Sequence, residues 1–251
     1  MKRTVTVGEI MLRLKTPEHM RILQTDAFEA SYGGAEANVA VSLAVLKDPV
    51  SFVTKLPENP VGTAALNEVR RYGADTSKVV IGGSRLGIYF FEKGTDIRPT
   101  NVVYDREGSA LALAKPEEFH WDEILKDTDI FYFSGVTPAV SENIAKAVLE
   151  ALKYCKAHGI ETVCDLNYRS KMWDTKKAQS VMSELMNYVT LCIANDEDFE
   201  SSLGIHAYDG DISKGIDQIE SYKAGMKEIQ NRYPNCKAVA SVLRNMYTAE
   251  D

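Results

Sequence analysis

Four polar clusters in the sequence could take part in chemistry, because each directly follows an apolar run. They are Gly8-Glu9, Ser134-Gly135, Asp165-Leu166-Asn167-Tyr168-Arg169 and Asn195-Asp196-Glu197-Asp198. Polar residues end many strands, so any single cluster is as readily structural as functional. The carboxyl ends of parallel strands, however, meet at one edge of a sheet, where open α/β folds bind ligands. Together the four clusters therefore predict a ligand site at that edge.

Two arginines are candidates for binding an anionic ligand there. Arg169 follows the run that ends at Asp165, and Arg106 follows Tyr104 in a segment of strand character. A guanidinium can bind a planar carboxylate through two parallel hydrogen bonds. Surface arginines are commonly solvated, and periodicity alone does not bring two segments together. A carboxylate site and two solvated side chains both stay open at this point.

The cluster at residues 195–198 also has two interpretations. Asn195 can cap a helix whose first turn carries three acidic residues, an arrangement that the helix dipole favours. The same carboxylates could organise hydrated magnesium near a nucleotide, because Mg²⁺ prefers oxygen ligands and keeps most of its waters.

A pair of glycines opens the helical pattern YGGAEANVAVSLAVL at residues 32–46. A helix start calls for a capping side chain, whereas glycines allow another group to approach the backbone closely at the helix N-terminus. We therefore expect a ligand beside Gly33 and Gly34, where the polar face of the helix begins with Glu36 and Asn38.

Apolar runs that alternate with helical patterns supply the elements that must position these residues. Strands are expected at residues 4–11, 50–56, 129–135, 161–167, 189–195 and 236–243, and helices at 35–46, 60–73, 141–159, 178–188 and 212–233. This rhythm predicts an α/β fold with a parallel-strand-rich central sheet flanked by helices.

Two stretches interrupt the rhythm, at about residues 11–31 and 86–107. Both are strand-like, contain turn residues and lack a helical pattern. We expect them to form a small β-sheet beside the main one, which could act as a lid. Since no repeat, low-complexity tract or linker is present, residues 1–251 are expected to form a single domain with this lid.

Composition narrows the classes of partner. The chain has 251 residues and a formal net charge of −7, which leaves little attraction for a polyanion, so nucleic acid is not expected as a partner. The widely spaced Cys155, Cys164, Cys192 and Cys236 lack zinc-site spacing, and we expect buried free thiols. No apolar run of signal-peptide or membrane length occurs, so we expect no membrane association and a cytoplasmic location.

Taken in order, the stretches YGGAEANVAVSLAVL, DLNYR, NDED and SVLRN resemble the ribokinase-like PfkB carbohydrate kinases. The resemblance covers essentially the whole chain, and within the family it is strongest to kinases of 2-keto-3-deoxygluconate. It implies a ribokinase-like fold, ATP and Mg²⁺ as cofactors, and transfer of the ATP γ-phosphate to the 6-hydroxyl of this sugar acid.

The resemblance also implies roles for individual residues. The substrate would be bound by Gly33, Gly34, Asn38, Tyr89, Tyr104, Arg106 and Arg169. Of these, Tyr89, Tyr104 and Arg106 would close over it from the lid, and Arg169 would hold its carboxylate. Nucleotide binding would involve Asn167, Asn195 and Arg244, and Asn195 and Asp198 would act on magnesium through water. Many neutral-sugar members carry Asp after the first-strand glycine, so Glu9 favours the keto-acid subgroup.

The chain departs from the family pattern at its end. Family members carry a Gly-Ala-Gly-Asp-type motif, whose glycines form an anion hole and whose Asp is the general base. No such motif occurs here, and the sequence stops at VLRNMYTAED. We therefore expect an incomplete and inactive kinase, with no catalytic residue in the chain and the base beyond residue 251. The strand at 236–243 would lack its covering segment, which predicts reduced stability.

Other functions stay open from the sequence. One is a kinase for a neutral sugar such as fructose or ribose, and another is a non-catalytic module that binds sugar acids. A third is a fragment that folds poorly. We also expect a homodimer through the lid, because strands carrying Ile88, Phe90 and Val102 would otherwise present an open edge.

Overall fold

A computed structural model of the chain describes residues 1–206 and 215–243. Its centre is a six-stranded sheet in the order β12-β11-β10-β9-β1-β4, and every neighbouring pair in it is parallel. The strands are β1 (Thr4–Val7), β4 (Val50–Val53), β9 (Ile130–Ser134), β10 (Glu161–Asp165), β11 (Leu191–Ile193) and β12 (Ala238–Ala240). The predicted parallel-strand-rich α/β sheet is confirmed, although β12 is shorter than the expected strand at 236–243.

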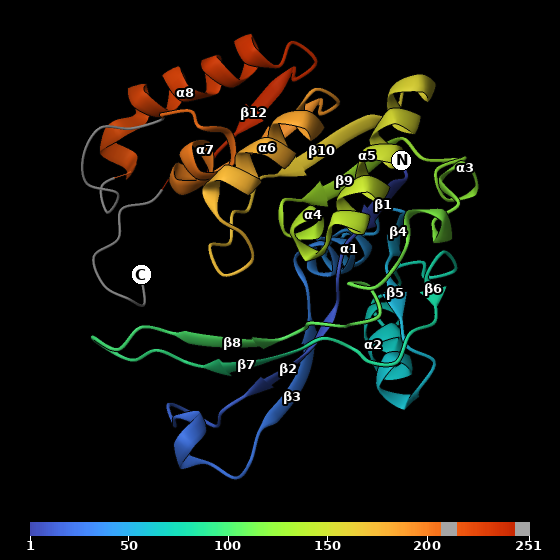
Figure 1. Cartoon of the computed structure of the whole chain (residues 1–251), viewed down its shortest axis with the longest axis vertical. Helices are drawn as coiled ribbons and strands as arrows, with labels where there is room; N and C mark the ends of the chain where they lie inside the picture. Colours follow the sequence, from blue (N-terminus) through green and yellow to red (C-terminus); the bar gives the residue numbers. More distant parts are fainter. Residues whose placement is uncertain (207–214, 244–251) are drawn as a thin grey trace.

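Helices flank this sheet (Figure 1). The longer ones are α1 (Ala35–Val45), α2 (Pro60–Arg70), α5 (Glu142–His158), α6 (Thr175–Met186), α7 (Asp196–Leu203) and α8 (Ile219–Arg232). Shorter turns are α3 (Trp121–Ile124), α4 (Val136–Val140), η1 (Ile22–Gln24), η2 (Pro116–Glu118) and η3 (Gly215–Gln218). Within the described residues no helix is long and apolar enough to cross a membrane.

Local sequence signals explain where several helices begin and end. The Asn59 side chain accepts hydrogen bonds from the backbone N–H groups of Val61 and Gly62 and so caps α2, whose first residue is proline. Ser141 caps α5 in the same way, and Gly159 ends that helix with φ of 70°, a conformation that glycine adopts without strain.

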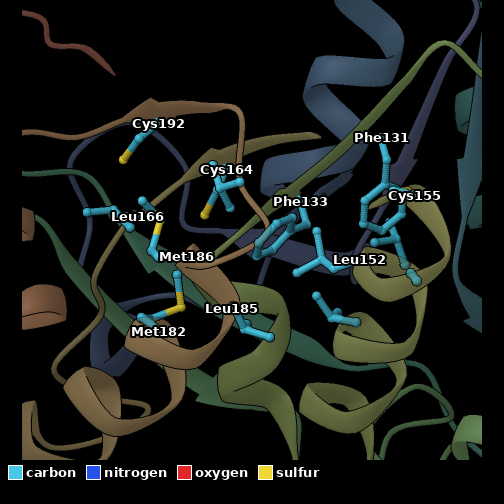
Figure 2. Close-up of a cluster of buried hydrophobic side chains, with 14 of the residues drawn as sticks. Phe131, Phe133, Leu152, Cys155, Cys164, Leu166, Met182, Leu185, Met186 and Cys192 are labelled. Carbon is cyan, nitrogen blue, oxygen red and sulfur yellow. The ribbon is translucent and has the colours of Figure 1, made fainter. Parts of the chain in front are cut away.

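Apolar side chains on the two faces of the sheet hold these layers together. Figure 2 shows part of one cluster, in which α5 and α6 pack on β9, β10 and β11. On the opposite face, α1 and α2 pack on β4 through a second cluster that includes Ala40, Phe52 and Ala65. All four cysteines are buried free thiols, as predicted. Burial raises the pKa of Cys155 to about 12, which keeps this thiol protonated and unreactive.

A smaller four-stranded sheet extends beside the main body (Figure 1). It contains β2 (Met11–Lys15), β3 (Glu29–Gly33), β7 (Ile88–Glu92) and β8 (Asn101–Asp105), in the order β3-β2-β7-β8. A short parallel pair, β5 (Lys55–Leu56) and β6 (Val80–Ile81), lies apart from it. The small sheet draws its strands from both stretches predicted to form the lid. Its movement as a lid stays a prediction.

The small sheet has two different faces, because side chains alternate along each strand. One face carries Arg13, Tyr89 and Tyr104, which lie side by side in the register of β2, β7 and β8. Val102 lies on this same face and lines a cavity, whereas Phe90 is on the opposite face and packs against Phe28. Ile88, Phe90 and Val102, named above for the open edge of these strands, therefore do not share one face, and association through that edge stays a prediction.

Candidate functional site

A cavity of about 390 Å³ lies between the small sheet and the carboxyl edge of the central sheet. All seven predicted substrate-binding residues line it, namely Gly33, Gly34, Asn38, Tyr89, Tyr104, Arg106 and Arg169. Asn167, predicted to bind the nucleotide, also lines this cavity. Further lining comes from residues that the sequence interpretation missed, including Met11, Arg13, Phe91, Val136 and Met172. We refer to this cavity as the candidate pocket.

The two glycines that precede α1 occupy different surroundings. A Cβ atom on Gly34 would lie 1.9 Å from the carbonyl oxygen of Glu9, so the chain's own packing requires glycine there. A Cβ atom on Gly33 would instead lie 3.4 Å from the Tyr89 hydroxyl and 3.9 Å from Asn38 Oδ1. Gly33 therefore keeps space open between two polar groups of the pocket, and this is the glycine that a ligand could approach.

Glu36 does not line the pocket, although the sequence suggested that it begins the polar face of α1. It is fully buried, and its Oε1 accepts hydrogen bonds from Ser134 N (3.0 Å), Ser134 Oγ (2.6 Å) and Thr137 Oγ1 (2.6 Å). Burial raises the pKa of Glu36 above its usual value, and the hydrogen bonds oppose that shift only in part. The residue joins α1 to the end of β9 and to α4.

Arg106 forms a buried ion pair with Glu9, which follows β1. Arg106 Nη2 donates to Glu9 Oε2, and Glu9 Oε1 accepts from Ser109 Oγ at 2.5 Å. Only 4% of the Glu9 side chain and 14% of the Arg106 side chain are exposed. Arg106 Nη1 also lies 3.2 Å from Met172 Sδ. The positive charge of Arg106 is therefore largely compensated within the protein, which the sequence interpretation of two free arginines did not anticipate.

Two other arginines of the pocket have no carboxylate partner among the described residues. Arg169 donates from Nη1 to the Tyr168 carbonyl oxygen at 2.8 Å. Arg13 places its guanidinium carbon 5.2 Å from the centre of the Phe91 ring, and its Nε is buried without a hydrogen-bond partner. The sequence interpretation missed Arg13, because its alternation with apolar residues in MLRLK predicts only a strand, and nothing local reveals which strand lies beside it.

A carboxyl group close to the pocket, that of Asp165, has a raised pKa. Burial, together with the nearby carboxylates of Asp198 and Glu36, raises the pKa of Asp165 from 3.8 to about 6, and Arg169 opposes part of that rise. Asp165 lies at the end of β10, directly before the loop that carries Asn167 and Arg169. The carboxyl edge of the sheet therefore holds closely spaced acidic groups behind cationic ones.

The residues at 195–198 act as a helix start in the structure. Asp198 is buried, and its two oxygens accept from Tyr168 N at 2.6 Å and from Asn195 N at 2.9 Å. The capping interpretation of this cluster is therefore confirmed. Among the described residues no group of three or more His, Cys, Asp and Glu side chains could hold a metal ion. Both Asp198 oxygens already accept from backbone N–H groups, and the water-mediated role of Asn195 and Asp198 in Mg²⁺ binding stays a prediction.

Two of the predicted nucleotide-binding residues, Asn167 and Asn195, follow the adjacent strands β10 and β11, and the Asp198 carboxylate links the two loops by accepting from Tyr168 N and Asn195 N. Asn167 lies in the candidate pocket with φ of 38°, and Asn195 is exposed at the start of α7. Arg244 lies outside the described residues. The structure therefore leaves the nucleotide roles of these three residues as predictions.

Comparisons with known proteins identify similar sequences and folds. A family model described as pfkB family carbohydrate kinase matches residues 1–234. A curated relative named 2-dehydro-3-deoxygalactonokinase, from Haloferax volcanii, is 38% identical over 207 residues, which cover 82% of this chain and 64% of the relative. The chain thus spans less than two thirds of the length of that relative.

Two solved structures are also similar to the chain. The 2-dehydro-3-deoxygluconokinase of Thermotoga maritima is 45% identical with a TM-score of 0.92, covering 99% of this chain and 74% of the other. A PfkB family carbohydrate kinase from Listeria grayi is 33% identical with a TM-score of 0.87, covering 98% of this chain and 73% of the other. The similarity therefore includes both the central sheet and the small sheet.

Proposed function

Because the chain belongs to the PfkB family of carbohydrate kinases, we propose that its substrate is the sugar acid 2-keto-3-deoxygluconate, phosphorylated at the 6-hydroxyl with ATP. This compound is the 2-dehydro-3-deoxygluconate in the name of the Thermotoga maritima relative. The Haloferax volcanii relative is named for the galactonate, which differs in configuration at carbon 4. The relatives therefore support a 2-keto-3-deoxy sugar acid and leave its stereochemistry open.

The observation that carries the proposal is the position of Arg169 in the candidate pocket. Its guanidinium donates to a carbonyl oxygen and forms no ion pair with a described carboxylate, although Asp165 lies near enough for Arg169 to lower its pKa. A carboxylate ligand would supply the missing charge through a paired hydrogen bond. Asn38, Tyr89 and Tyr104 supply amide and hydroxyl groups in the same pocket, which suit the hydroxyls of a sugar. The pocket thus combines groups for both ends of a sugar acid.

The 251 residues include groups suited to bind this substrate, but none to which we assign the proton transfer that its phosphorylation requires. They contain no Gly-Ala-Gly-Asp-type motif, and we assign no general base among them. Phosphoryl transfer depends on positioning and on stabilisation of the charge that develops in the transition state. We therefore expect this chain to bind the sugar acid and to show no turnover with ATP and Mg²⁺. In a coupled ADP-release assay, turnover near one per second, an ordinary kinase rate, would show that a base lies within the chain.

Binding calorimetry without ATP tests the proposed substrate. We expect heat on titration with 2-keto-3-deoxygluconate and much weaker binding of fructose and ribose. Arg169→Ala should weaken the keto acid by tenfold or more, since a charge-assisted hydrogen bond contributes about 1.5–3 kcal/mol, and should change fructose binding little. Arg71→Ala is a control, because Arg71 is exposed at the end of α2. Equal or tighter binding of fructose would contradict the sugar-acid assignment and favour a neutral-sugar kinase.

A further inference from the structure

Arg13 is a cation of the candidate pocket to which the family resemblance gives no role. It lies in the middle of β2, in register with Tyr89 on β7, which is in turn opposite Tyr104 on β8. These three side chains form one row on the face of the small sheet that lines the pocket. The row places a guanidinium beside two phenol hydroxyls that are both expected to contact substrate.

The guanidinium of Arg13 packs on an aromatic ring and forms no ion pair with a described carboxylate. It lies over the Phe91 ring, a contact that favours a cation on the ring face. Burial raises the pKa of the Tyr89 hydroxyl, and the Arg13 guanidinium opposes part of that rise through its charge and a side-chain hydrogen bond to this hydroxyl. Its Nε is buried without a hydrogen-bond partner. A buried donor without an acceptor is unfavourable, so an acceptor brought by a ligand would be stabilised there.

Neighbouring cations differ from Arg13 because each has a carboxylate partner, although the Nε of Arg106 is likewise buried without a hydrogen-bond partner. Lys15, two residues along the same strand face, pairs with Glu29 at 2.9 Å. Arg85 pairs with Asp105 at 3.0 Å, and Arg106 pairs with Glu9. Arg13 forms no such pair with any described carboxylate. The fold therefore neutralises the cations around Arg13 and leaves this one available to an anion in the pocket.

We propose that Arg13 is a specificity-determining residue that binds the carboxylate of the substrate together with Arg169. The sequence interpretation paired Arg106 with Arg169 as candidates for binding an anion, but the Glu9 ion pair already occupies the Arg106 side chain. Arg13 comes from the small sheet and Arg169 from the loop after β10, so one carboxylate would join the two parts of the fold. This inference rests on the proposed sugar-acid function.

Two guanidiniums also provide discrimination against neutral sugars. A carboxylate has two oxygens and can accept from both arginines, whereas a neutral sugar would bury one or both cations without a countercharge. A site built for polar partners rejects ligands that leave those partners unsatisfied. Arg13 would therefore contribute to selectivity for acids as well as to affinity.

The test compares a carboxylate ligand with its uncharged ester. The 251-residue chain and its Arg13→Met variant are titrated by calorimetry with 2-keto-3-deoxygluconate and with the methyl ester of that acid. Methionine keeps a long apolar side chain against Phe91 but removes the donors and the charge. We expect the variant to bind the acid roughly tenfold to a hundredfold more weakly, as loss of a charge-assisted hydrogen bond predicts, with ester binding changed less than threefold.

Two further variants make the result decisive. Lys15→Met removes a cation from the same strand face outside the pocket lining and should leave both affinities unchanged. Arg13→Lys keeps the charge without the planar fork, and we expect a smaller loss that is again confined to the acid. If Arg13→Met does not fold, the Arg13→Lys comparison decides alone.

The failures of the two proposals can be told apart. If the unmodified chain does not bind the keto acid, the proposed function is wrong and the role of Arg13 falls with it. If the chain binds the acid and the Arg13 variants bind it as tightly, or lose acid and ester binding equally, the function stands and the role proposed for Arg13 is wrong.

Discussion

The buried ion pair between Glu9 and Arg106 leads to a quantitative prediction about stability. Their side chains are 4% and 14% exposed, and Glu9 also accepts a hydrogen bond from Ser109. Glu9→Ala would leave a largely buried guanidinium without its countercharge, which costs about 3–5 kcal/mol in comparable buried pairs. Since about 1 kcal/mol corresponds to about 2–4 °C in a chain of this size, the melting temperature should fall by roughly 10 °C.

A double-mutant cycle separates the pair from other effects of each substitution. We propose Glu9→Gln, Arg106→Met and their combination, with unfolding in urea followed by circular dichroism. Because Gln preserves shape and one acceptor, we expect it to cost about 1–3 kcal/mol, the difference between charged and neutral hydrogen bonds plus desolvation. The coupling energy between the two sites should be about 1–3 kcal/mol, as for other contacting residues.

The matched control is the pair of Arg85 and Asp105, whose side chains are 36% and 53% exposed at a separation of 3.0 Å. Exposed pairs contribute about 0–1 kcal/mol, so its coupling energy should be clearly smaller. A coupling energy for Glu9 and Arg106 no larger than that of the exposed pair would contradict a stabilising role of the buried ion pair. It would mean that the positive charge of Arg106 is not compensated by Glu9 and is available to a ligand.

Three further predictions concern the sheet edge, the glycines and the small sheet. The pKa of Asp165 is raised from 3.8 to about 6, so its stabilising contribution is present below about pH 4 and is lost as pH rises through about 6. Between those pH values the free energy of unfolding of Asp165→Asn, measured by urea titration, should rise by about 1–3 kcal/mol relative to that of the unmodified chain. Parallel curves of unfolding free energy against pH would contradict this. Gly34→Ala should destabilise the fold by about 1–3 kcal/mol by overpacking against the Glu9 carbonyl. Gly33→Ala should leave the melting temperature nearly unchanged and weaken keto-acid binding. Similar melting curves for both variants would contradict this difference between the two glycines. Sedimentation should show a homodimer that Phe90→Asp dissociates, and a monomer of the unmodified chain would contradict the expected association through the small sheet.

The part of the central sheet formed by β1, β4 and β9 could be predicted from sequence because these strands are buried on both faces. Runs such as IFYFS in β9 and VSFV in β4 are apolar almost throughout, which is typical of parallel strands covered by helices. The helices between them carry their own start and stop signals, as Asn59 and Gly159 show. In these segments the local sequence signals match the elements of the final fold, so the hydrophobic pattern was enough to predict them.

The pocket was predicted from motifs, whereas its charge pairing was not. The predicted substrate residues do line one cavity, because strand ends and the start of α1 meet at the sheet edge. The partner of Arg106 is Glu9, 97 residues away, and no local pattern encodes that contact. Arg13 was missed for the same reason, because its position beside Tyr89 depends on the register between β2 and β7.

The most direct measurement is a crystal structure of this chain with 2-keto-3-deoxygluconate bound. We expect the sugar acid in the candidate pocket, with its carboxylate oxygens about 2.7–2.9 Å from guanidinium nitrogens of both Arg13 and Arg169, the range of charge-assisted hydrogen bonds. We also expect the ion pair of Arg106 with Glu9 to be retained. A carboxylate directed to solvent, or bound by Arg106 after release of Glu9 while Arg13 contacts nothing, would show that Arg13 and Arg169 do not form the carboxylate site.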